Sequence, residues 1–157
     1  MSHDHHGAVL SVGHRDTELS KALSDGLDEV NFPATGTTAA DQTSLSVKIV
    51  GDDGELIGGL TGWTWGGLFG IEMLWIRAAS RRDGWGGRLL LAAEEEARAR
   101  GCDRACVSSF TFQAPGFYQR HGYRETGRTL GFPGGAEDVH MFKRLVPEAD
   151  SESQSVG

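Results

Sequence analysis

The sequence has few cysteines and lacks a long hydrophobic run, and each shortage excludes a class of protein. Two of the 157 residues are cysteines, Cys102 and Cys106. Their spacing fits neither a Cys-x-x-Cys redox pair nor a zinc-binding pair, so we expect reduced packing residues and no metal site. No segment has the length of a membrane span, and the first residues lack the apolar core of a signal peptide. We therefore expect a cytoplasmic protein without a membrane partner.

Positive charge is also scarce. The chain has 15 Lys and Arg against 22 Asp and Glu, a formal net charge of −7 at pH 7. Nucleic-acid binding needs a basic surface, so no nucleic-acid partner is expected, whereas a cationic amine would be attracted. The local exception is a basic cluster formed by Arg77, Arg81, Arg82 and Arg88.

Composition predicts one folded domain with a polar segment at each end. A hydrophobic content of 38% allows a single core, which we place at residues 15–146. Residues 1–14 are expected to be flexible, and residues 147–157, rich in Ser, Glu and Asp, to be a disordered tail. His3, Asp4, His5 and His6 could hold a metal, but a mobile polar terminus explains them more simply and we assign them no role.

Hydrophobic periodicity predicts an α/β (α+β) fold. An amphipathic helix over 16–29 precedes three antiparallel strands, and a helix over 88–100 leads to a strand reached by a helical crossover, hence parallel to the strand before it. The result is a mixed, mostly antiparallel central sheet with one parallel junction, flanked by helices. The expected strands are 45–50, 55–65, 68–76, 105–110, 123–130 and 139–144, and a short helix covers 114–121.

Three details within these elements are also predicted. Gly58 and Gly59 suggest a β-bulge. The helix over 88–100 carries a packing face and, on its exposed side, two ion pairs between residues four apart. The packing face is Leu90, Ala93 and Ala97, and the pairs are Glu94 with Arg98 and Glu96 with Arg100.

A glycine-rich bend at 81–88 joins an apolar strand to that helix. Free N–H groups and the helix dipole favour an anion at such a junction, and a diphosphate is the natural occupant. A P-loop would need Lys and then Ser or Thr after the glycines, and neither is present. A dinucleotide-binding fingerprint would need a small residue where Leu89 stands, and three antiparallel strands precede the bend.

Two motifs together resemble a known family. Arg81, Gly84 and Gly86 fill the pattern R-x-x-G-x-G, which resembles the acyl-CoA pyrophosphate loop of the GNAT N-acetyltransferase superfamily. Residues 114–123, Ala-Pro-Gly-Phe-Tyr-Gln-Arg-His-Gly-Tyr, resemble its A-x-x-F-Y-x-x-x-G-[FY] segment. The resemblance spans about 68–144. It implies a GNAT-like fold and acetyl-CoA as cosubstrate, with an amine attacking the thioester directly in a ternary complex.

The resemblance also implies a set of coenzyme-binding residues. Thr111 stands where many members carry an Asn, and its hydroxyl can still donate and accept a hydrogen bond. The set is Leu74, Trp75, Ile76, Arg81, Arg82, Asp83, Gly84, Trp85, Gly86, Gly87, Arg88, Thr111 and Phe117.

Two residues are candidates for proton transfer. Tyr118 occupies the tyrosine position of the family motif and would protonate the departing thiolate; the alternative is simple aromatic packing. Glu72 is a lone carboxylate in an apolar strand and could deprotonate the amine through water; the alternative is an ion pair or a strand-edge charge. The backbone N–H of Ile76 or a neighbour is the expected oxyanion donor.

Acceptor-binding residues are less constrained by the sequence. Trp63 and Trp65 lie two apart on one strand, so they point to the same side and form either a core pair or one wall of the acceptor pocket. Asn31, Phe32 and Gln113 could border that pocket, and His140 could be a second proton carrier. A surface or packing role is as good an explanation for each of these four residues.

The predicted function is transfer of an acetyl group from acetyl-CoA to a primary amine, the acceptor being a small molecule. A protein or peptide N-acetyltransferase and a non-catalytic acyl-CoA-binding regulator are the alternatives. A toxin that acts on aminoacyl-tRNA is disfavoured by the acidic balance. The partner is then an amine-bearing small molecule or peptide, and a homodimer is left open.

Overall fold

The computed structural model describes residues 7–147. Residues 3–6, with the histidine cluster, and most of the proposed tail at 147–157 lie outside the described residues. The chain divides into two units between Thr37 and Thr38. No helix in the described part is long and apolar enough to cross a membrane.

The first unit contains helix α1, Thr17–Thr35. The side chain of Asp16 caps it by accepting a hydrogen bond from the Leu19 N–H at 2.9 Å. The predicted end at residue 29 is wrong, because the helix continues through Pro33. It ends at Gly36, whose φ of 68° is the left-handed conformation that glycine adopts without strain.

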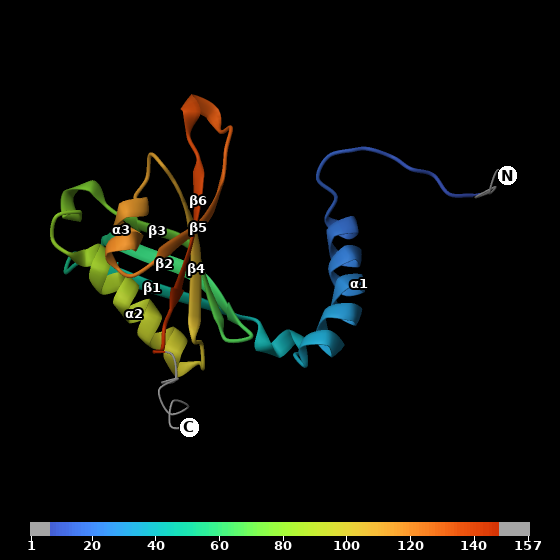
Figure 1. Ribbon diagram of the computed structural model, residues 1–157, viewed down its shortest axis with the longest axis horizontal. Helices are drawn as coiled ribbons and strands as arrows, with labels where there is room; N and C mark the ends of the chain where they lie inside the picture. Colours follow the sequence, from blue (N-terminus) through green and yellow to red (C-terminus); the bar gives the residue numbers. More distant parts are fainter. Residues whose placement is uncertain (1–6, 148–157) are drawn as a thin grey trace, which may run out of the picture. The chain divides into compact units, whose positions relative to one another are not determined.

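The second unit is built on a six-stranded sheet with the strand order β1-β2-β3-β4-β6-β5 (Figure 1). One neighbouring pair, β3 with β4, is parallel and the other pairs are antiparallel, which confirms the predicted mixed sheet. The strands are β1 (Thr43–Val50), β2 (Leu56–Trp65), β3 (Leu68–Ile76), β4 (Arg104–Phe110), β5 (Arg124–Thr129) and β6 (Asp138–Arg144), and short 3₁₀ turns cover Ala39–Asp41, Ala78–Ser80 and Pro133–Gly135.

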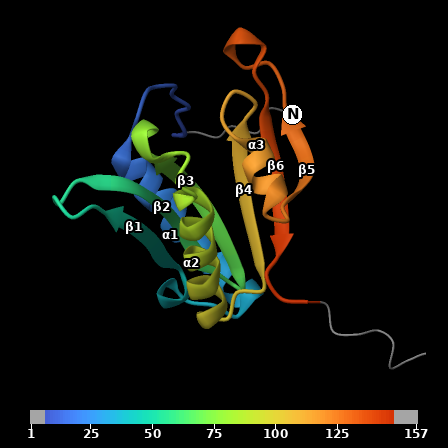
Figure 2. The same cartoon turned by 90° about the vertical axis from the view of Figure 1, so that its left-hand side faces the viewer.

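Two helices of this unit cover the same face of the sheet (Figures 1 and 2). They are α2, Trp85–Ala99, and α3, Pro115–Arg120. The predicted packing face of α2 is confirmed, since Leu90, Ala93 and Ala97 are fully buried. Helix α2 begins three residues earlier than predicted because Gly84 makes the turn with a φ of 77° and the next residues are already helical.

The two central strands, β3 and β4, separate in the middle of the sheet. Strand β3 pairs with β2 along its whole length, but with β4 at three positions only, the last of which is Gly70 with Cys106. Beyond that pair β3 and β4 diverge, as Figure 2 shows. The edge of β3 from Ile71 onward is therefore not paired with β4.

Both bulges in the first three strands lie beside glycines. Ile49 pairs with Gly58 and Val50 with Leu56, which leaves one extra residue immediately before Gly58 and places the bulge next to the predicted position. The second bulge was not predicted. Thr61 pairs with Met73 and Gly62 with Ile71, so that Glu72 is the extra residue of β3.

One of the two predicted ion pairs on α2 is wrong. Glu96 and Arg100 form theirs at 3.0 Å, which confirms that prediction. Glu94 is instead fully buried, because on a helix it lies in the same stripe as Leu90, Ala93 and Ala97. Its intended partner, Arg98, donates to the backbone carbonyl of Leu145.

The cysteines are free thiols, as predicted, with Cys102 buried and Cys106 half-buried. Burial raises the pKa of both thiols, which makes them poor nucleophiles at neutral pH. Within residues 7–147 no group of three or more His, Cys, Asp or Glu side chains is arranged to hold a metal ion.

Candidate active site

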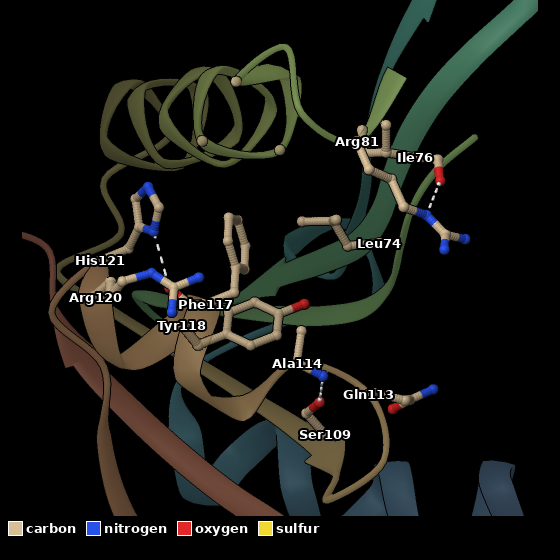
Figure 3. Close-up of a pocket in the computed structure, with 13 residues that line it drawn as sticks. Leu74, Ile76, Arg81, Ser109, Gln113, Ala114, Phe117, Tyr118, Arg120 and His121 are labelled. Carbon is tan, nitrogen blue, oxygen red and sulfur yellow. Dashed lines mark hydrogen bonds between the residues drawn. The ribbon is translucent and has the colours of Figure 1, made fainter. Parts of the chain in front are cut away.

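A pocket of about 610 Å³ opens where β3 and β4 diverge. Its walls come from the first turn of α2 and from α3, and its base from the ends of the two strands (Figure 3). The lining residues are Leu74, Ile76, Arg81, Gly84, Gly86, Gly87, Ser109, Gln113, Ala114, Phe117, Tyr118, Arg120 and His121.

The first wall is made mostly of backbone. Helix α2 begins after Gly84, and the first N–H groups of a helix have no intrahelical acceptor. Gly86 and Gly87 keep this turn bare: an added Cβ would lie 3.3 Å from the Phe117 ring or 3.0 Å from Nε2 of His121. The wall can therefore bind an anion through main-chain donors and the helix dipole.

Arginine side chains flank this wall. Arg81 Nε donates to the carbonyl oxygen of Ile76 at 3.0 Å, which anchors the bend to the end of β3 (Figure 3). The Arg88 guanidinium lies 4.2 Å from the centre of the Trp85 ring, a cation–π contact. Arg120 contributes a further positive charge from α3.

The second wall is made of side chains from α3. The Phe117 and Tyr118 rings pack edge to face, with centroids 5.2 Å apart. Tyr118 is 7% exposed, and this burial raises the pKa of its phenol to about 12. Its hydroxyl points into the pocket in Figure 3, and no group within residues 7–147 hydrogen-bonds to it. A protonated donor thus faces the pocket without a hydrogen-bond partner among the residues that the structure describes.

The predicted coenzyme residues fall into two groups. Seven line the pocket: Leu74, Ile76, Arg81, Gly84, Gly86, Gly87 and Phe117. Six do not: Trp75, Arg82, Asp83, Trp85, Arg88 and Thr111. Trp75 is 51% exposed, and the Thr111 hydroxyl accepts a hydrogen bond from the Glu137 N–H at 3.2 Å.

Several lining residues were missed by the sequence reasoning. Arg120 and His121 occupy unspecified positions of the α3 motif, where the pattern carries no information about side chains. His121 Nδ1 lies 2.9 Å from the Phe117 carbonyl oxygen, which fixes the imidazole against α2. Ser109 accepts a hydrogen bond from the Ala114 N–H at 3.4 Å and helps to place the start of α3. Only its position at the end of a strand could have indicated it.

Glu72 does not line the pocket. It is exposed and is the bulged residue of β3. A bulge re-aims a side chain relative to the regular alternation of a strand, so its placement beside the divergence of β3 and β4 is compatible with the predicted role as a base. That role stays a prediction.

A smaller hollow of about 340 Å³ lies on the opposite face of the sheet. Trp63, Ser108, His140 and Phe142 line it, and in their strands they alternate with residues buried beneath the helices. Trp63 and Trp65 are half-buried and outside the buried core, so of the two alternatives the core pair is wrong, and a role in acceptor binding stays a prediction. His140 Nε2 lies 2.9 Å from the Thr129 hydroxyl.

The remaining acceptor candidates are divided between the two units. Gln113 lines the main pocket and accepts a hydrogen bond from the Phe110 N–H at 3.0 Å. Asn31 and Phe32 are part of α1; Asn31 is exposed and Phe32 half-buried. Their role in acceptor binding stays a prediction.

Comparison with known proteins agrees with this geometry. The model of the Acetyltransferase (GNAT) family matches residues 16–123. This chain therefore belongs to the GNAT acetyltransferases. It is 36% identical over 130 residues to an acetyltransferase of Agrobacterium fabrum, covering 83% of this chain and 93% of that protein.

Two further relatives extend the comparison. The blasticidin-S acetyltransferase of Streptomyces morookaense is 41% identical over 99 residues, which cover 60% of this chain and 71% of that protein. The crystal structure of an acetyltransferase from Bacillus cereus aligns with a TM-score of 0.74 at 28% identity, covering 86% of this chain and 97% of that one. The GNAT fold expected from the sequence is confirmed.

Proposed function

We propose that this protein transfers an acetyl group from acetyl-CoA to a primary amine of a small molecule, both substrates being bound together. The observation that carries the proposal is the pocket itself. It joins a bare helix N-terminus, suited to a diphosphate, to a buried and protonated tyrosine hydroxyl. The Streptomyces relative, named for acetylation of blasticidin S, favours a small-molecule acceptor.

In this proposal the coenzyme diphosphate binds the first turn of α2. The absence of side chains at Gly86 and Gly87 lets an anion approach the backbone, and Arg81 and Arg120 supply positive charge at the rim. The acyl-bearing arm would run along the unpaired edge of β3 beside Leu74 and Ile76. The coenzyme is then held by main-chain groups and the reacting end lies near Tyr118.

The unpaired edge of β3 also supplies the proposed oxyanion donor. The carbonyl of Ile76 accepts a hydrogen bond from Arg81 and is thereby directed away from β2. In a β-strand the N–H and C=O of one residue point to the same edge, so the Ile76 N–H faces the divergence of β3 and β4. That N–H is suited to stabilise negative charge on a thioester oxygen.

The reaction needs three proton transfers. The ammonium group gives one proton to Glu72 through water, and the free amine attacks the thioester carbonyl and forms a C–N bond. The C–S bond then breaks as the Tyr118 hydroxyl gives its proton to the departing sulfur, and the surplus proton on the new amide nitrogen returns to the Tyr118 phenolate. No covalent acyl-enzyme is involved, since both cysteines are raised-pKa thiols and neither lines the pocket.

Thiol release from acetyl-CoA, measured over a panel of small amines and Lys-containing peptides, tests the proposal. We expect turnover with at least one small amine and none with peptides. Turnover with peptides alone would favour a protein N-acetyltransferase. Binding of acetyl-CoA without turnover of any acceptor would favour a regulator.

A further inference from the structure

A buried charged cluster lies behind the pocket and is not used by the reaction described above. Glu94 of α2 is fully buried, and both of its carboxylate oxygens are 2.9 Å from Lys143 Nζ of β6. The Tyr123 hydroxyl, from the turn between α3 and β5, donates to Glu94 Oε2 at 2.9 Å. Three separate elements thus meet at one carboxylate.

Stability alone is a poor explanation for this cluster. The desolvation cost of a buried ion pair can exceed its Coulombic gain, and apolar side chains of similar volume often replace such pairs at no loss. Burial and the negative charge of Glu94 raise the pKa of the Tyr123 phenol, so its hydroxyl remains a hydrogen-bond donor. What the cluster provides is a defined geometry: the carboxylate accepts from one donor on each of two other elements.

Tyr123 connects the cluster directly to Tyr118. The Tyr123 N–H donates to the carbonyl oxygen of Tyr118 at 3.0 Å. The two rings also pack edge to face, with centroids 5.6 Å apart and an interplanar angle of 77°. Because no described residue hydrogen-bonds to the Tyr118 hydroxyl, its ring is held by packing, to which the Tyr123 and Phe117 rings contribute directly.

We propose that Glu94, Tyr123 and Lys143 form a positioning cluster that sets the orientation of the Tyr118 phenol relative to α2. The first turn of α2 lines the same pocket, so the cluster ties the proposed proton donor to the helix that would hold the coenzyme. These are positioning residues, since none of the three lines the pocket. The kinetic part of this proposal rests on the proposed function.

The kinetic test compares two neighbouring glutamates of α2. Glu94→Gln keeps the shape of the side chain and an acceptor for Tyr123, but it removes the charge that holds Lys143. We expect kcat to fall about tenfold with the KM for acetyl-CoA within about twofold, because small misplacements of a catalytic group are costly. The exposed neighbour Glu95, replaced as Glu95→Gln, serves as the control and should leave both constants unchanged.

A double-mutant cycle asks whether the effect passes through Tyr118. In a Tyr118→Phe background, Glu94→Gln should lower kcat by no more than about twofold, because the donor it positions is already gone. A full tenfold loss in that background would overturn the proposal. If Glu94→Gln does not fold, as judged by thermal melting, Tyr123→Phe takes its place in the same cycle.

A second measurement does not depend on activity. The chain contains two tyrosines, Tyr118 and Tyr123, so ring-labelled tyrosine gives two NMR signals, which Tyr118→Phe and Tyr123→Phe assign. We expect Glu94→Gln to shift or broaden the Tyr118 signal and Glu95→Gln to leave it in place. An unmoved Tyr118 signal overturns the positioning cluster, whereas an inactive wild-type protein with the expected shifts overturns the proposed function alone.

Discussion

The two walls of the pocket are built from different materials. The wall at the start of α2 consists of backbone without side chains, at Gly86 and Gly87. The wall at α3 consists of the side chains of Phe117, Tyr118 and His121. A backbone site needs glycines at particular positions, and a side-chain site needs support from behind. The first is therefore damaged by adding atoms, and the second by removing a single functional group.

The largest effect is expected from adding bulk and charge to the backbone wall. In Gly86→Asp the new Cβ would lie 3.3 Å from the Phe117 ring, and the carboxylate would occupy the place of an anion at the helix start. We expect the wild type to bind acetyl-CoA with an affinity on the order of micromolar, and the variant to bind it about 100-fold more weakly or worse, measured by calorimetry.

Gly127→Asp is the matched control for that experiment. It introduces the same charge on the exposed strand β5, where an added Cβ meets nothing within 4 Å. If the wild type and both variants bind acetyl-CoA with equal affinity, the diphosphate does not bind at the start of α2.

The next effect concerns the side-chain wall. Tyr118→Phe keeps the ring and its contacts with Phe117 and Tyr123, and it removes only the proton donor. We expect kcat to fall by about 10²–10³-fold with acetyl-CoA affinity unchanged, measured by thiol release and calorimetry on the same samples. If the variant has the same kcat as the wild type, Tyr118 is a packing residue and not the proton donor.

A smaller effect is expected on the amine side. Glu72→Gln preserves the size of the bulged residue of β3 and removes its ability to accept a proton. We expect kcat/KM for the amine to fall about tenfold at neutral pH, with acetyl-CoA affinity unaffected. The exposed Asp52→Asn, in the turn before β2, is the control, and equal losses in both would point to a general charge effect.

The two walls also differ in how far the sequence predicts them. Gly84 and Gly86 stand at fixed offsets from Arg81 within one turn, so a local pattern is sufficient to place an anion site there. Tyr118 is found by the same kind of pattern. The residues that support Tyr118 cannot be found in this way. Glu94 lies 49 residues from Lys143 and 29 residues from Tyr123 in the sequence, so a local pattern does not contain their contacts.

The errors have the same physical origin. Four-residue spacing paired Glu94 with Arg98, but the burial of the stripe that contains Glu94 is decided by tertiary packing. The bulge at Glu72 depends on how β2 and β3 register, which strand periodicity does not contain. Helix α1 runs past Pro33 and ends at Gly36, which adopts the left-handed conformation. Local signals therefore predict elements and motifs better than the contacts between them.

The smallest expected effect lies where the two walls meet. A Cβ at Gly87 would approach Nε2 of His121 to 3.0 Å, and that imidazole is held by the Phe117 carbonyl. Gly87→Ala should therefore raise the KM for acetyl-CoA a few-fold by pushing α3 from α2, although alanine favours the helix by about 1 kcal/mol. His121→Ala in the same chain should restore the KM, because it removes the imidazole Nε2 that the Cβ of Ala at position 87 would otherwise contact. If the double variant is no better than Gly87→Ala, the alanine acts on the bound anion itself, and the two walls do not communicate at this contact.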